Sequence, residues 1–146
     1  MDESEYERAI SAGKAGTIYD WTLEFLEGVG NNKSLARTLR QKGNFHFGPI
    51  DYPIDKFMPI LGPDKTFKYY EDQDTIDKRV TAMEKSFNEG WKPAPLIVSD
   101  IWEDYLEVAD GAHRFELLRR LGIKSYPTIF YFKDQSALDS FVKSLE

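Results

Sequence analysis

The chain has 146 residues, 41% of them hydrophobic, with a net charge of −6 and a sequence pI near 5.0. These values predict one globular chain with a sizeable core, and the acidic balance disfavours a whole-surface electrostatic grip on nucleic acid. Because cysteine is absent and no apolar run approaches membrane-spanning length, disulfides, cysteine nucleophiles and transmembrane helices are excluded, and we expect a cytoplasmic protein.

Hydrophobic periodicity predicts a helical N-terminal segment over residues 1–48. Apolar residues recur at helical spacing in three stretches, and glycines follow the first two. The predicted helices are residues 2–12, 17–27 and 33–42. The third is basic along its length, which a solvated face explains better than a DNA-recognition helix, because the rest of a helix-turn-helix motif is missing.

Residues 43–49 (Gly-Asn-Phe-His-Phe-Gly-Pro) break the helical pattern and indicate a boundary to a second domain, residues 49–146. Short apolar runs there alternate with amphipathic stretches. The expected strands are residues 50–55, 96–98, 105–109 and 126–132. The expected helices are residues 75–88, capped by Asp74 or Thr75, the stretch from the 110–114 turn to Gly122, and residues 136–145. Residues 65–74 are predicted to form a loop or lid.

The sequence Asp110-Gly111-Ala112-His113-Arg114 joins a predicted strand to a predicted helix. A helix entered through such a turn presents unpaired N–H groups and a partial positive charge, which favour an anion such as phosphate. Arg114 could bind phosphate oxygens through two N–H groups. In the simpler alternative, Asp110 is an N-cap and the basic side chains are solvated. Cations in a first turn oppose the helix dipole, so we expect something negatively charged nearby.

The order of elements and the Asp-Gly-x-His-Arg core, with its Leu-Gly ending, resemble the ParB/sulfiredoxin-like superfamily, which includes ParB-like nuclease domains, over roughly residues 49–132. The resemblance implies an α+β fold, with a small mixed sheet and packed helices, here preceded by the N-terminal helical segment. Members bind nucleotides or phosphoryl groups where the turn meets its helix. The resemblance therefore places a binding site at residues 110–114.

The sequence differs from the motif of each branch of the superfamily, and these differences limit which activity can be expected. Sulfiredoxins carry a cysteine where this chain has Ala112, so their chemistry is excluded. Partition ParB proteins bind CTP, clamp on DNA, show Gly-Glu-Arg-Arg at the turn and continue into a helix-turn-helix domain. This chain has Gly-Ala-His-Arg and ends soon after its last predicted strand, so a full partition protein is not expected. The local motif is most similar to the free serine kinase type, Asp-Gly-His-His-Arg.

The kinase-type resemblance implies a nucleotide, ATP or ADP with Mg²⁺, that donates phosphate to a small hydroxyl-bearing substrate such as serine. The implied nucleotide-binding residues are Gly111, Ala112, His113 and Arg114. The implied catalytic residues are Asp110, His113 and Asp64, and Asp110 is also the candidate metal ligand. Those kinases carry a His-Glu pair after the first strand, where this chain has Leu-Gly-Pro-Asp over residues 61–64. Asp64, Glu71 and Asp72 are therefore candidates for the missing carboxylate.

Two other interpretations stay open. Ala112 and the missing His-Glu pair favour a non-catalytic nucleotide-binding sensor or interaction module. A DNA-binding or nuclease protein would use the basic helix 33–42 together with the motif, and the acidic net charge makes a nucleic-acid partner less favourable. No feature of the sequence indicates a membrane partner, and the oligomeric state is not specified.

Overall fold

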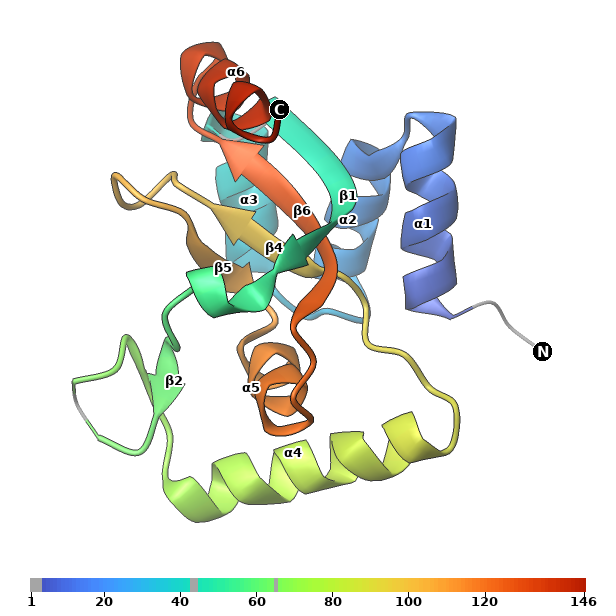
Figure 1. The fold of residues 1–146 in the computed structure, drawn as a ribbon, viewed down its shortest axis with the longest axis vertical. Helices are drawn as coiled ribbons and strands as arrows, with labels where there is room; N and C mark the ends of the chain where they lie inside the picture. The colour runs from blue at the N-terminus through green and yellow to red at the C-terminus, as the bar shows by residue number, and fades with distance from the viewer. Residues whose placement is uncertain (1–3, 43–44, 65) are drawn as a thin grey trace.

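A computed structural model describes residues 4–42, 45–64 and 66–146, in which helices cover both faces of a four-stranded sheet (Figure 1). The helices are α1 Glu5–Ala15, α2 Ile18–Glu27, α3 Lys33–Lys42, α4 Gln73–Asn88, α5 Ala112–Arg120 and α6 Gln135–Ser144, with the 3-10 helix η1 Ile54–Lys56. The strands are β1 Phe45–Pro53, β2 Leu61–Gly62, β3 Tyr69–Tyr70, β4 Leu96–Ser99, β5 Glu107–Asp110 and β6 Ser125–Phe132. The predicted α+β class is confirmed.

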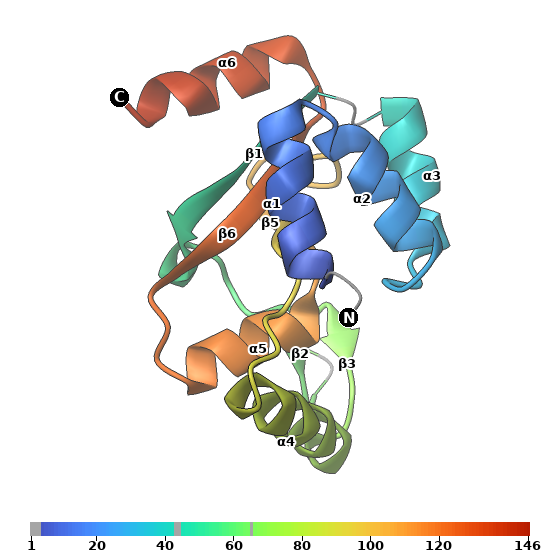
Figure 2. The ribbon, with the colours of Figure 1, turned by 90° about the vertical axis from the view of Figure 1, so that its right-hand side faces the viewer.

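The sheet is mixed, as expected, with the strand order β1-β6-β4-β5. β6 pairs antiparallel with β1 and parallel with β4, and β4 pairs antiparallel with β5. The central position of β6 suits its β-branched and aromatic sequence, which packs well on a pleated surface. β2 and β3 form a separate two-stranded parallel pair near α4 (Figure 2).

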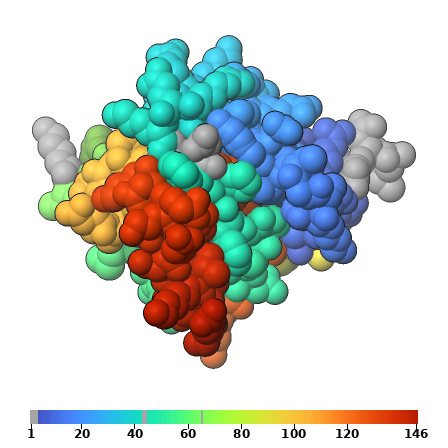
Figure 3. Space-filling model, turned by 90° about the horizontal axis from the view of Figure 1, so that it is seen from above, coloured from blue at the N-terminus to red at the C-terminus, as the bar shows by residue number. Residues whose placement is uncertain are grey.

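Strand side chains alternate between two buried layers because successive residues point to opposite faces. Ile97, Ile129 and Tyr131 pack in one core with α1, α2 and α3. Phe130 and Leu96 pack in the other core, which also contains residues of α5 and α6. Figure 2 shows α1–α3 on one side of the sheet with α4 and α5 at its lower end. Seen from above in Figure 3, α6 lies at the surface beside the residues of β1.

The predicted boundary between residues 48 and 49 falls inside β1, which begins at Phe45. Gly43 and Asn44, at the start of that predicted stretch, lie outside the described residues. The N-terminal helices bury Ala9, Trp21 and Leu39 in the core that they share with the sheet. The helices α1–α3 therefore pack as one layer of the fold.

Several elements differ from the sequence prediction, for reasons of packing, capping or strand pairing. α1 continues through Gly13 to Ala15, and a Cβ at Gly13 would lie 2.6 Å from Cδ of Pro49, so glycine permits close contact with β1. α4 begins at Gln73 because Asp72, not Asp74 or Thr75, is its N-cap. β3 lies within the stretch predicted to be a loop or lid, of which Lys65 is outside the described residues.

Candidate functional site

The turn at residues 110–114 connects β5 to α5, and Gly111 is the N-cap of the helix. Its φ of 106° is a conformation that side chains other than glycine rarely adopt, and an added Cβ would lie 2.8 Å from Cζ of Arg114. The alternative in which Asp110 caps the helix is therefore wrong. No side chain among the described residues caps α5, so its first N–H groups stay available at the turn.

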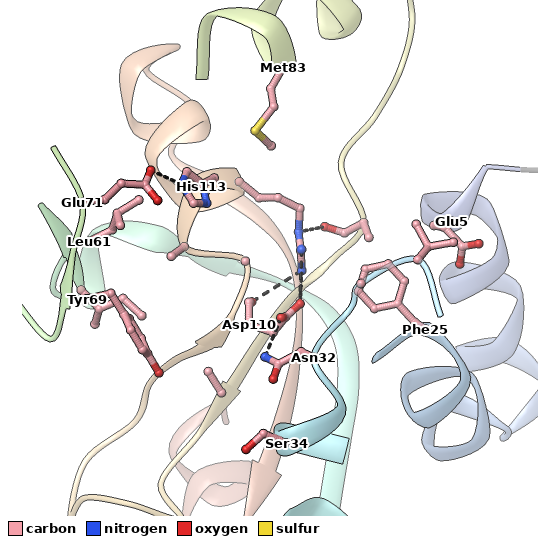
Figure 4. Close-up of a pocket in the computed structure, with 18 of the residues that line it drawn as sticks. Glu5, Phe25, Asn32, Ser34, Leu61, Tyr69, Glu71, Met83, Asp110 and His113 are labelled. Carbon is pink, nitrogen blue, oxygen red and sulfur yellow. Dashed lines mark hydrogen bonds and ion pairs between the residues drawn. The ribbon is translucent and has the colours of Figure 1, made fainter. Parts of the chain in front are cut away.

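Asp110 is held by side chains on both sides of the turn (Figure 4). Its Oδ1 accepts a hydrogen bond of 2.9 Å from Nδ2 of Asn32, and its Oδ2 lies 3.3 Å from Nη1 and Nη2 of Arg114. Asn32 also caps α3, because its Oδ1 accepts from the backbone N of Leu35. The carboxylate is only 10% exposed. It is thus a largely buried group, with a partner on each oxygen, that joins the N-terminal helices to the turn.

Arg114 extends this network away from the turn. Its Nε donates to the carbonyl of Ala94 at 3.1 Å, and its Nη2 donates to the carbonyl of Pro95 at 2.9 Å. The guanidinium also lies 5.5 Å from the ring centroid of Phe25 on α2, at cation–π distance. With its side chain 13% exposed, Arg114 is bound mainly to protein acceptors, whereas the sequence predicted a phosphate ligand for it.

His113 points to the opposite side of the turn, where its Nε2 lies 2.9 Å from Oε1 of Glu71. Glu71 directly follows β3, and its backbone N donates to the carbonyl of Gly62. In the neutral tautomer whose Nε2–H donates a hydrogen bond to the Glu71 carboxylate, Nδ1 is the hydrogen-bond acceptor of the ring. The pair is partly exposed, with 22% of the histidine and 24% of the glutamate side chain accessible.

Both arrangements line a pocket of about 880 Å³, which lies between the N-terminal helices, the α5 turn and the β2–β3 segment. The aromatic side chains Tyr69, Tyr70 and Trp91 line it and are 46%, 62% and 38% exposed. Its volume falls within the range of small-molecule sites, roughly 300–1,000 Å³. We refer to it as the turn pocket.

The structure brings some of the predicted site residues together and separates others. Gly111, Ala112, His113, Arg114 and Asp110 all line the turn pocket. Asp64 does not, because its carboxylate bonds to the backbone N and hydroxyl of Thr66 in its own loop. Asp72 caps α4. Of the three candidate carboxylates, Glu71 is the one that contacts His113, and it is a negatively charged group near the first turn.

Asn32 and Phe25 are site residues that the motif did not predict. The contact of Asn32 with Asp110 crosses 78 positions of the chain. In the basic helix α3, Arg40 makes a bidentate pair with Glu27, with distances of 2.5 and 2.6 Å. Glu27 of α2 therefore neutralises part of the positive charge of α3.

Two further features bear on ligands. Among the described residues, no three His, Cys, Asp or Glu side chains form a group that could hold a metal ion. In the same part of the chain, every helix is too short or too polar to cross a membrane.

Comparisons with known proteins concern the fold. No protein-family model and no curated protein matches the chain. Among solved structures, the chain is similar to the C2221 form of a Pnob8-like ParB-N domain, with a TM-score of 0.38 and 22% sequence identity. The match covers 68% of this chain and 34% of that chain, so this chain spans about a third of the length of the protein it matches.

Proposed function

We propose that the turn pocket binds a nucleotide or a related phosphorylated small molecule, with a phosphate at the N-terminus of α5. The observation that carries this proposal is the combination, in one pocket, of an uncapped helix N-terminus with the His113–Glu71 pair. The uncapped N–H groups of Ala112 and His113 and the positive end of the helix favour an anion. Tyr69 and Tyr70 offer aromatic faces on which a base can stack.

The charges that line the pocket favour a phosphate that is accompanied by Mg²⁺. Glu5, Glu71 and Asp110 contribute three carboxylates, and Arg114 already pairs with Asp110. Glu5 pairs with Arg8 at 3.4 Å, so among the described residues Glu71 is the carboxylate that a bare polyphosphate would approach without a lysine or arginine partner. Mg²⁺ commonly binds through one or two carboxylates together with substrate phosphates, so it does not require a preformed cage of three protein ligands.

The same geometry is compatible with phosphoryl transfer to a hydroxyl group. In such a reaction the hydroxyl oxygen bonds to the terminal phosphorus, and the bond from that phosphorus to the bridging oxygen of the nucleotide breaks. His113 accepts the hydroxyl proton at Nδ1, and Glu71 stabilises the imidazolium through Nε2. Asp110 is a positioning residue in this scheme, because both of its oxygens are already bound.

A second candidate is a binding module without catalysis. Arg114 donates to the Asp110 carboxylate and to the backbone carbonyls of Ala94 and Pro95, so its guanidinium is not free to stabilise a transferring phosphoryl group. This observation favours a sensor or interaction module that holds a nucleotide and leaves it unchanged.

Calorimetric titration with ATP, ADP and CTP, each with and without Mg²⁺, tests the binding proposal. We expect saturable binding of at least one nucleotide that weakens at least about ten-fold in Glu71→Gln and His113→Gln. Asp64→Asn is the matched control and should leave affinity unchanged, because Asp64 lies outside the pocket. Absence of binding to every nucleotide, or equal effects of all three substitutions, would contradict the proposal.

Incubation with the bound nucleotide and pooled small hydroxyl compounds then separates the two candidates. A phosphorylated product detected by mass, and lost in His113→Gln, supports the kinase. Nucleotide binding with no product in the same pool supports the module.

A further inference from the structure

A second pocket, of about 690 Å³, lies beside the start of β5 and is separate from the catalytic candidates above. Its lining comes from the η1 region, from residues 66–68 before β3, and from residues 103–107. Met58 and Tyr105 line it and are 76% and 60% exposed, and Trp102 beside it is 45% exposed. We call it the Glu107 pocket.

The Glu107 pocket contains a buried carboxylate. Glu107 is only 6% exposed, and its Oε1 accepts a hydrogen bond from Nζ of Lys68. The same Nζ lies 5.2 Å from the ring centroid of Trp102. A buried carboxylate and the face of a tryptophan together make a favourable environment for an alkylammonium ion. The chain places one of its own lysines in that environment.

Another ammonium group can replace that of Lys68 on Glu107 without a change in the charge of the site. An incoming ammonium would make the same contacts, so Glu107 would never be left as an unpaired buried charge. The side chain of Lys68 is 36% exposed and belongs to a segment between short elements, so its ammonium can return to water, where it is well hydrated. The net charge of −6 also favours the approach of basic partners.

We propose that the Glu107 pocket binds a lysine side chain of a partner polypeptide, whose ammonium replaces Lys68 on Glu107. A free amine would only reproduce the contact that Lys68 already makes with Glu107. Because Lys68 is tethered to the chain, a free amine would compete with it poorly. A polypeptide can add apolar contacts to Met58 and Tyr105, which are otherwise exposed. This proposal is independent of nucleotide binding in the turn pocket.

The chain offers a matched control for this exchange. Lys56 lines the same pocket, but its Nζ lies 5.4 Å from the ring centroid of Tyr52 and does not pair with Glu107. Lys68→Met and Lys56→Met therefore remove equal charge from the same pocket. Only the first empties the ammonium site.

The test is an NMR titration of the Trp102 indole N–H, assigned with Trp102→Phe, using an acetylated and amidated Leu-Lys-Leu peptide. We expect a saturable shift, affinity at least about ten-fold tighter in Lys68→Met, and no change in Lys56→Met. The double variant Lys68→Met/Glu107→Leu replaces both members of the pair by apolar groups, which keeps the core free of an unpaired charge, and it should not bind.

Three results would overturn the proposal. A Leu-Gln-Leu peptide that binds as tightly as Leu-Lys-Leu would show that the ammonium is not recognised. Equal affinity for n-butylamine and the peptide would show that the rest of the polypeptide contributes nothing to binding. Retention of peptide binding in the double variant, or no saturable shift in either wild type or Lys68→Met, would show that Glu107 is not the binding group.

Discussion

Replacing Arg114 with alanine is expected to destabilise the protein strongly, because its guanidinium is bound at the centre of the turn network. The substitution removes the partner of the Asp110 carboxylate, which is 10% exposed, and the donors to the carbonyls of Ala94 and Pro95. Loss of one member of a buried ion pair costs about 3–5 kcal/mol. For a chain of this length that loss lowers Tm by roughly 6–20 °C.

Urea and thermal unfolding followed by circular dichroism measure this effect. Arg119→Ala is the matched control on the same helix, because the side chain of Arg119 is 46% exposed and pairs with Glu116 at the surface. An exposed pair contributes about 0–1 kcal/mol, so we expect little change in the control. The reasoning is refuted if Arg114→Ala is no more destabilising than Arg119→Ala. A buried role also predicts that Arg114→Ala/Asp110→Asn loses less stability than Arg114→Ala alone.

Three other predictions concern stability. Gly111→Ala should lower the free energy of unfolding by about 1–3 kcal/mol and by more than Gly122→Ala, where an added Cβ meets nothing within 4 Å, as measured by urea unfolding. A side-chain hydrogen bond from Thr75 lowers the pKa of Asp72. Because the unfolded chain binds that proton more tightly, this stabilisation is complete above about pH 4 and is lost as pH falls through the lowered pKa. Asp72→Asn should therefore reduce the fall in Tm that accompanies acidification below about pH 4. A fall in Tm with pH as steep as that of the wild type would contradict this. Asn32→Ala should cost about 2–4 kcal/mol, because it removes a helix cap and a donor to a buried carboxylate, whereas Asn32→Ser, which retains the cap, should cost less in the same urea assay.

Local patterns predicted the type of most elements. Residues 17–27 and 33–42 were predicted as helices, and α2 and α3 occupy almost the same ranges. Those helices have one apolar face and polar ends, so periodicity contains the necessary information. Element ends were less predictable where a distant partner decides them. β1 begins at Phe45 because it pairs with Phe132 of β6, a contact that no local pattern encodes.

The position of the candidate site was predictable from the motif, but the orientation of its side chains was not. The acceptors of Arg114 include the carbonyls of Ala94 and Pro95, which lie twenty and nineteen positions earlier in the chain. The sequence offered three carboxylates as partners for the motif. Only the placement of the β2–β3 segment beside α5 identifies Glu71 as the one that contacts His113.

The central claim, that a phosphate binds at the N-terminus of α5, is tested most directly by the backbone amide resonances of Ala112 and His113. In a ¹⁵N NMR titration with ADP and ATP in the presence of Mg²⁺, the account predicts that these two amides show the largest saturable shifts. It also predicts that the shifts weaken in Glu71→Gln and persist in Asp64→Asn. Unchanged resonances at both amides, or largest shifts in a distant element such as α3, would contradict the account.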